Sequence, residues 1–141
     1  MLCASLGAGA SGPLESTPAR LCISLLFQLH GETLSNVDRI LEGALDIHVH
    51  FSPDPKVERR AGAVEIALQA KELGMQGVVL KSHEYPTHPV ADTTSELVPE
   101  VTVLGGVALD LGVGGLNIHA VEATANMGGR IVWMPTYSAK A

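Results

Sequence analysis

Four short runs of β-branched and aliphatic residues alternate with segments of helical periodicity along most of this chain. The expected strands cover residues 44–51, 76–81, 101–107 and 130–134. The expected helices between them cover residues 63–73, 89–97 and 118–127. Gly74 is placed to end the first helix, and Asn117 is placed to cap the third. Alternating units of about 25 to 30 residues predict an α/β fold with a parallel sheet and right-handed crossovers.

The second expected strand sharpens this prediction, because residues 76–81 are almost continuously apolar. Such runs are typical of parallel strands that are buried on both faces. A complete (β/α)8 barrel takes about 250 residues, whereas this chain supplies about four βα units. We therefore expect residues 40–141 to form the N-terminal half of a TIM-like barrel. Residues 1–39 are expected to be an N-terminal extension, largely disordered or partly helical, because its first 20 residues are rich in Gly, Ser, Ala and Pro.

Charge and composition exclude several classes of partner. The formal net charge is −6 and no basic patch is evident, which argues against nucleic acid and anionic lipid. No run approaches the roughly 20 apolar residues of a membrane span. Cys3 and Cys22 are the only cysteines and both lie in the N-terminal segment, which predicts no disulfide framework and a cytoplasmic location. A small-molecule substrate is the expected partner.

The first expected strand carries the clearest chemical signal. Alternation along residues 44–51 places Asp46, His48 and His50 on the same face. Two imidazoles at this spacing are close enough to bind one metal ion, and imidazole is a natural ligand for zinc and other divalent metals. We predict His48 and His50 as metal ligands, with Asp46 orienting His48. The alternative is that both are ordinary strand histidines.

A second group of polar residues follows the second strand. Lys81 and His83 are expected to reach the same mouth of the barrel, where such folds build their active sites, and we predict catalytic roles for both. Lys81 is open to three interpretations: a carbamylated metal ligand, a substrate-binding cation, or a salt-bridge partner. His83 can also be a simple loop histidine. Tyr85 and Thr136 are expected to contact substrate, and Trp133 is expected in the core.

With these residues in view, the chain resembles the amidohydrolase superfamily of metal-dependent hydrolases. The closer resemblance is to uncharacterised amidohydrolase-like proteins of the DUF6282 type. The segments that carry it occur in order along residues 40–141. They are residues 42–50 with 52–54, 77–83, 114–117 and 130–136.

The resemblance implies a TIM-like barrel with one or two divalent metals, zinc first among them. It implies that metal-activated water attacks an amide, cyclic amide or ester. His48 and His50 are then ligands, and Lys81 and His83 belong to the same site. Members of the superfamily take further histidines and an essential aspartate from later strands, so we expect these 141 residues to be inactive without a missing C-terminal half or a second copy. The alternatives are a non-catalytic metal- or ligand-binding remnant, and a phosphoesterase of the histidinol-phosphatase type.

Overall fold

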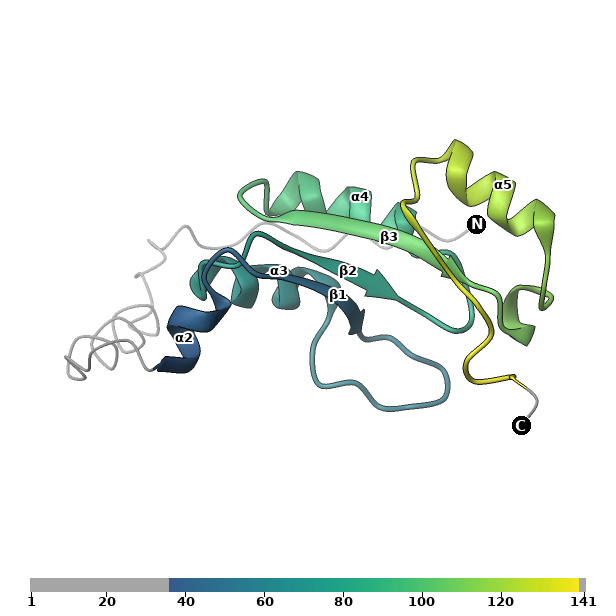
Figure 1. Cartoon of the computed structure of the whole chain (residues 1–141), viewed down its shortest axis with the longest axis horizontal. Coiled ribbons are helices and arrows are strands. Elements are labelled where there is room, and N and C mark those ends of the chain that lie inside the picture. Colours follow the sequence, from purple (N-terminus) through teal and green to yellow (C-terminus); the bar gives the residue numbers. More distant parts are fainter. Residues whose placement is uncertain (1–35, 140–141) are drawn as a thin grey trace, which may run out of the picture. The chain divides into compact units, whose positions relative to one another are not determined.

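The computed structural model describes residues 36–139 (Figure 1). Residues 1–35, which hold both cysteines and most of the predicted N-terminal extension, lie outside this range. The described part contains four strands that alternate with helices. The strands are β1 (Leu45–His50), β2 (Gly77–Lys81), β3 (Thr102–Ala108) and β4 (Ile131–Trp133).

The four strands form one parallel sheet in the order β1-β2-β3-β4. Strand order therefore follows chain order, and the sheet curls as half of a barrel (Figure 1). This arrangement confirms the predicted fold class. It also brings the C-terminal ends of all four strands to the same edge, where Lys81 of β2 lies in register with His50 of β1.

The helices fall close to their predicted positions. They are α2 (Asn36–Leu41), α3 (Ala63–Glu72), α4 (His88–Leu97), α5 (Ile118–Asn126) and the unpredicted 3-10 turn η1 (Leu111–Val113). The Asn117 side chain caps α5 by accepting from the backbone N–H groups of His119 and Ala120, and Gly74 follows α3 with φ of 67°. Among residues 36–139, no helix has the length and apolar character needed to cross a membrane.

The core lies between the outer face of the sheet and helices α3 and α4. Alternate residues of β2 and β3 point into it, as expected for strands whose side chains alternate between two faces. The helices meet them with small side chains, which lets helix and sheet approach closely. The buried residues at this contact are Ala63, Ala67, Ala70, Val78, Leu80, Ala91 and Val103.

The outer face of β1 is less covered than its alternation predicts. Phe51 is buried at 3% exposure, but Leu45 is 43% exposed and Ile47 is 60% exposed. The pairing register between β1 and β2 also shifts between Asp46 and Val49. β1 is an edge strand, and α3 covers only the part of it that continues into Phe51. The apolar face is therefore present, but only its C-terminal part is packed.

The loop that leads from β2 to α4 is fastened between two strands by Thr87. Its buried hydroxyl donates to the carbonyl of Leu80 at 2.6 Å and accepts from the N–H of Gly106 at 3.0 Å. The start of α4 also lies directly on β3, where a Cβ at Gly105 would overlap the backbone of His88. These contacts position the segment that carries His83.

Replacing Thr87 with Val should destabilise the fold, because the isosteric side chain deprives two buried backbone groups of their hydrogen bonds. We expect a loss of about 2 kcal/mol in the free energy of unfolding, measured by urea denaturation. Thr87→Ser keeps the hydroxyl and should recover most of this loss. Equal stability of Thr87→Val and wild type would contradict the anchoring role.

Candidate functional site

His48 and His50 lie side by side on the inner face of β1. Their Nε2 atoms are 3.2 Å apart, and their ring centroids are 5.1 Å apart. The backbone N–H of His48 donates to Oδ1 of Asp46 at 3.0 Å, so Asp46 supports the strand at His48 and not its ring. The two imidazoles that alternation predicted to converge do converge.

His83 extends this pair into a row of three imidazoles. Its ring stacks on that of His50 with centroids 4.8 Å apart and an angle of 26° between the planes. On the other side, the ring of Trp133 from β4 lies 6.3 Å from that of His48. Trp133 was expected in the core, but it is only half-buried and borders the site.

The environment favours the neutral form of the histidines on β1. Burial lowers the pKa of His50 to about 4, with a further contribution from the Arg59 charge. Burial also lowers the pKa of His48, assisted by the Lys81 charge. Both rings therefore offer a nitrogen lone pair at neutral pH, the form in which imidazole binds metals. Nδ1 of His50 is buried and has no hydrogen-bond partner among the described residues.

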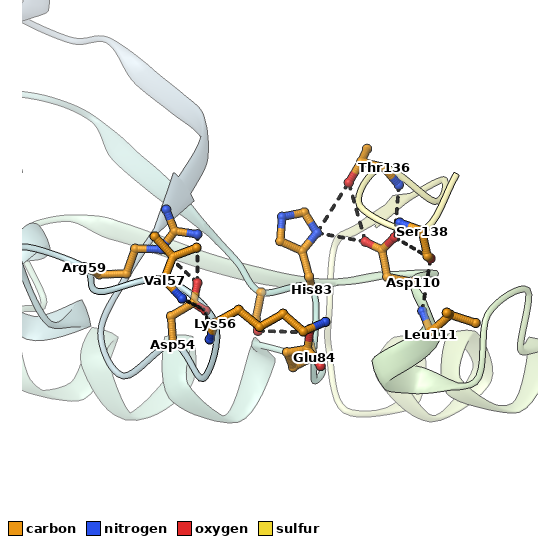
Figure 2. Close-up of polar contacts among 11 residues, drawn as sticks. Asp54, Lys56, Val57, Arg59, His83, Glu84, Asp110, Leu111, Thr136 and Ser138 are labelled. Carbon is orange, nitrogen blue, oxygen red and sulfur yellow. Dashed lines mark hydrogen bonds and ion pairs between the residues drawn. The ribbon is translucent and has the colours of Figure 1, made fainter. Parts of the chain in front are cut away.

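His83 is oriented by Asp110, which follows β3. The two side chains meet at 2.8 Å between Nδ1 and Oδ2, as Figure 2 shows. An ionised carboxylate only accepts hydrogen bonds, so Nδ1 of His83 carries the proton. In the neutral ring, Nε2 then holds the free lone pair.

Asp110 also binds the segment that follows β4. Its Oδ1 accepts from the backbone N–H of Thr136 at 3.1 Å and from both the N–H and the hydroxyl of Ser138, each at 2.8 Å (Figure 2). Burial alone would raise the pKa of Asp110, but the hydrogen bonds from His83, Ser138 and Thr136 outweigh it and hold the pKa well below its usual range. The carboxylate thus joins the ends of β2, β3 and β4.

Lys81 is almost completely buried, with 1% of the residue exposed. Its Nζ contacts Oγ1 of Thr136 at 3.4 Å and lies 5.3 Å from the centre of the Trp133 ring. Burial lowers the pKa of Lys81, and the Asp110 charge opposes this effect. Lys81 and Thr136, predicted from separate strands, therefore meet.

The long loop between β1 and α3 reaches over to the other loops at this edge. Its Asp54 accepts two backbone N–H bonds and pairs with Arg59 at 2.8 Å, and the pKa of Asp54 falls to about 2, with the Lys56 N–H bond as the largest cause. Lys56 pairs with Glu84 at 2.6 Å (Figure 2). Its Nζ also lies over the Tyr137 ring. Two cations of this loop, Lys56 and Arg59, are therefore already paired, and Arg60 is exposed.

Tyr85 lies apart from this group. It packs edge-on against Phe51 and lines a pocket of about 900 Å³ on the helix side of the sheet, with Val64 and Val90 among the other lining residues. Its role in substrate binding stays a prediction for that pocket. Within the part of the chain that the structure describes, no group of three or more His, Cys, Asp or Glu side chains is arranged to hold a metal ion.

Comparison with known protein families gives a match over most of the chain. The model of a family of unknown function, DUF6282, matches residues 43–141, which is most of the chain. The chain belongs to the DUF6282 family. The match confirms the resemblance to DUF6282 proteins, and it spans every predicted site residue, from Asp46 to Thr136. Neither the curated proteins nor the solved structures contain a significant match.

Replacing Asp110 with Asn should cost at least about 2 kcal/mol of stability at pH 7, because a charged acceptor of several hydrogen bonds is lost. The low folded-state pKa of Asp110 also makes its contribution pH-dependent. The unfolded chain takes up the proton first, so this stability is present at neutral pH and is lost as the pH falls below about 3.9. Urea unfolding from pH 7 to pH 3 should show a steeper acid decline in wild type than in Asp110→Asn.

Asp92→Asn, on the exposed side of α4, is the matched control and should keep the wild-type acid decline. Parallel declines in wild type and Asp110→Asn would contradict the role given to the Asp110 carboxylate.

Proposed function

We propose that this DUF6282 protein is a metal-dependent hydrolase of the amidohydrolase type, acting on an amide, cyclic amide or ester of a small molecule. The observation that carries the proposal is the 3.2 Å separation of the His48 and His50 Nε2 atoms. Zinc–nitrogen bonds of 2.0–2.1 Å in a tetrahedral site correspond to about 3.3 Å between two ligand nitrogens. The pair thus has the spacing of two ligands to one cation, and zinc is the metal we propose, as one or two ions.

An N–H···N hydrogen bond between the two neutral rings would have the same distance, and the zinc titration below separates the two interpretations. Both rings are held neutral, and no proton has to be displaced from either ring at pH 7 for Nε2 to act as a ligand. The arrangement has a cost, because ligation through Nε2 leaves the proton on the buried Nδ1 of His50. An unpaired buried donor costs about 1–3 kcal/mol, which metal binding has to offset.

The residues around the pair have complementary roles in this proposal. A divalent cation would supply Lewis-acid activation of water and of a substrate carbonyl. His83 presents a free Nε2 lone pair as the proton acceptor, while Asp110 holds the ring and stabilises it once protonated. Lys81 and Thr136 lie on the neighbouring strands, where the rest of a substrate would be bound.

Two imidazoles do not complete a catalytic metal site, which usually takes three protein ligands. The described residues offer no third ligand in a suitable arrangement. The proposal therefore includes further ligands from outside residues 36–139, from residues beyond this chain or from a second copy. Without them, metal binding should be measurable but modest.

The proposed metal site predicts saturable zinc binding that depends on His48 and His50. Isothermal titration of the metal-free protein should show binding to wild type, and the double variant His48→Ala/His50→Ala should lose it. His119→Ala removes a strongly exposed histidine of α5 and serves as the matched control. Equal zinc binding by the double variant and the control would overturn the ligand assignment.

Hydrolysis is tested with the zinc-loaded protein against N-acyl amino acids, cyclic amides, carboxylic esters and a phosphate monoester, with products followed by mass spectrometry. We expect little or no turnover by this chain alone. Once further ligands complete the metal site, we expect release of the amide or ester products, and a loss of about 100-fold in His83→Gln because the proton acceptor is removed. Turnover of the phosphate ester alone would favour the phosphoesterase alternative. Zinc binding by the completed site without turnover of any of these substrates would contradict the hydrolase proposal and favour a non-catalytic metal-binding protein.

A further inference from the structure

Lys81 is a buried cation near the strand ends that has no acidic partner. Lys56 pairs with Glu84, and Arg59 pairs with Asp54. Among the described side chains of residues 39–139, no carboxylate oxygen lies within the 4.0 Å of an ion pair with Lys81. The one carboxylate that influences its charge, Asp110, already accepts hydrogen bonds from His83, Thr136 and Ser138.

The hydrogen bonds of Lys81 are also incomplete. An ammonium group has three N–H donors, and the described residues provide one long contact, at 3.4 Å, to Oγ1 of Thr136. The Trp133 ring at 5.3 Å offers its electron-rich face but no hydrogen-bond acceptor. A buried charge is normally paired, and Lys81 is buried to 99%. Two of the three N–H donors of Lys81 therefore have no acceptor among the described residues.

The position of Lys81 is that of a ligand-binding group. It ends β2 in register with His50, so its backbone lies one strand spacing, about 4.8 Å, from that of a proposed metal ligand. Thr136 is solvent-exposed, so the Lys81–Thr136 contact lies at the boundary between the site and solvent. A small anion placed between these two side chains would be a neighbour of the imidazole row.

We propose that Lys81 and Thr136 bind a carboxylate group of the substrate and that the protein therefore acts on a small molecule that carries a carboxylate beside its hydrolysable bond. That the bound molecule is a substrate with a hydrolysable bond rests on the proposed hydrolase function. The anion site itself rests only on the burial, the missing partner and the register of Lys81.

A carboxylate suits this pair better than a phosphate. The ammonium group provides a charge of +1 and two N–H donors beyond the one that contacts Thr136, which match a singly charged group with two oxygens. The Thr136 hydroxyl, whose 3.5 Å contact to Asp110 is long, can turn to add one more donor. Phosphate sites usually contain a guanidinium group, several backbone N–H donors, or both. Arg59 of the β1–α3 loop is engaged with Asp54 through both Nε and Nη2, and the neighbouring Arg60 is exposed.

The single tryptophan of the chain provides the measurement, because Trp133 lies against Lys81. The full-length, metal-free protein is titrated at constant ionic strength with acetate, with neutral acetamide of the same size, and with inorganic phosphate. The Trp133 indole N–H resonance and the tryptophan fluorescence are followed. We expect saturable changes with acetate, none with acetamide, and weaker binding of phosphate than of acetate.

Lys81→Gln should weaken acetate binding by about tenfold or more, the usual effect of losing a hydrogen bond to a charged group. Lys71→Gln is the matched control, since Lys71 is an exposed lysine of α3 that pairs with Glu100, and it should bind acetate like wild type. If Lys81→Gln fails to fold, the wild-type comparison of acetate with acetamide decides the question.

Identical responses to acetate and acetamide would overturn the anion site, and so would unchanged acetate binding in a folded Lys81→Gln variant. Tighter binding of phosphate than of acetate would overturn the carboxylate assignment. Because no metal and no turnover enter this experiment, its failure leaves the hydrolase proposal standing. Conversely, acetate binding without zinc binding or hydrolysis would remove the hydrolase and keep the anion site.

Discussion

The buried carboxylate of Asp110 joins three segments that are far apart in the sequence. It accepts hydrogen bonds from His83 after β2 and from Thr136 and Ser138 after β4, while Asp110 itself follows β3. A buried carboxylate is costly unless it is well paired, so these donors and the carboxylate hold one another in place. The orientation of His83, and the approach of Thr136 to Lys81, both depend on this one group.

Several charged groups around the site are neutralised by a partner or by burial, and Lys81 is an exception. Arg59 and Lys56 of the β1–α3 loop are neutralised by Asp54 and Glu84, and the two imidazoles of β1 are kept neutral by burial. Lys81 is the buried cation of the site and has no ion-pair partner among the described side chains. A buried ammonium group with unused N–H donors is an arrangement that favours binding of a small anion.

Much of the fold follows from short-range patterns, because continuous apolar strands and helix caps act within a few residues. The burial of β2, the cap at Asn117 and the convergence of His48 and His50 are of this kind. Alternation also identified the apolar face of β1, but it does not tell what covers that face, and Ile47 is exposed. The role of Asp110 depends on contacts with residues 26 to 28 positions away, beyond the reach of such patterns. Its position directly after β3, like that of His83 after β2, was the available signal.

Each strand of the sheet pairs with the strand that follows it in the chain. Parallel sheets usually fold slowly, because their partners are distant in sequence and loop closure has an entropic cost. Here the separation is kept to a single βα unit at every step, so the contact order stays low for a parallel sheet. Each new strand can add to the growing edge as it leaves the ribosome, without waiting for the rest of the chain.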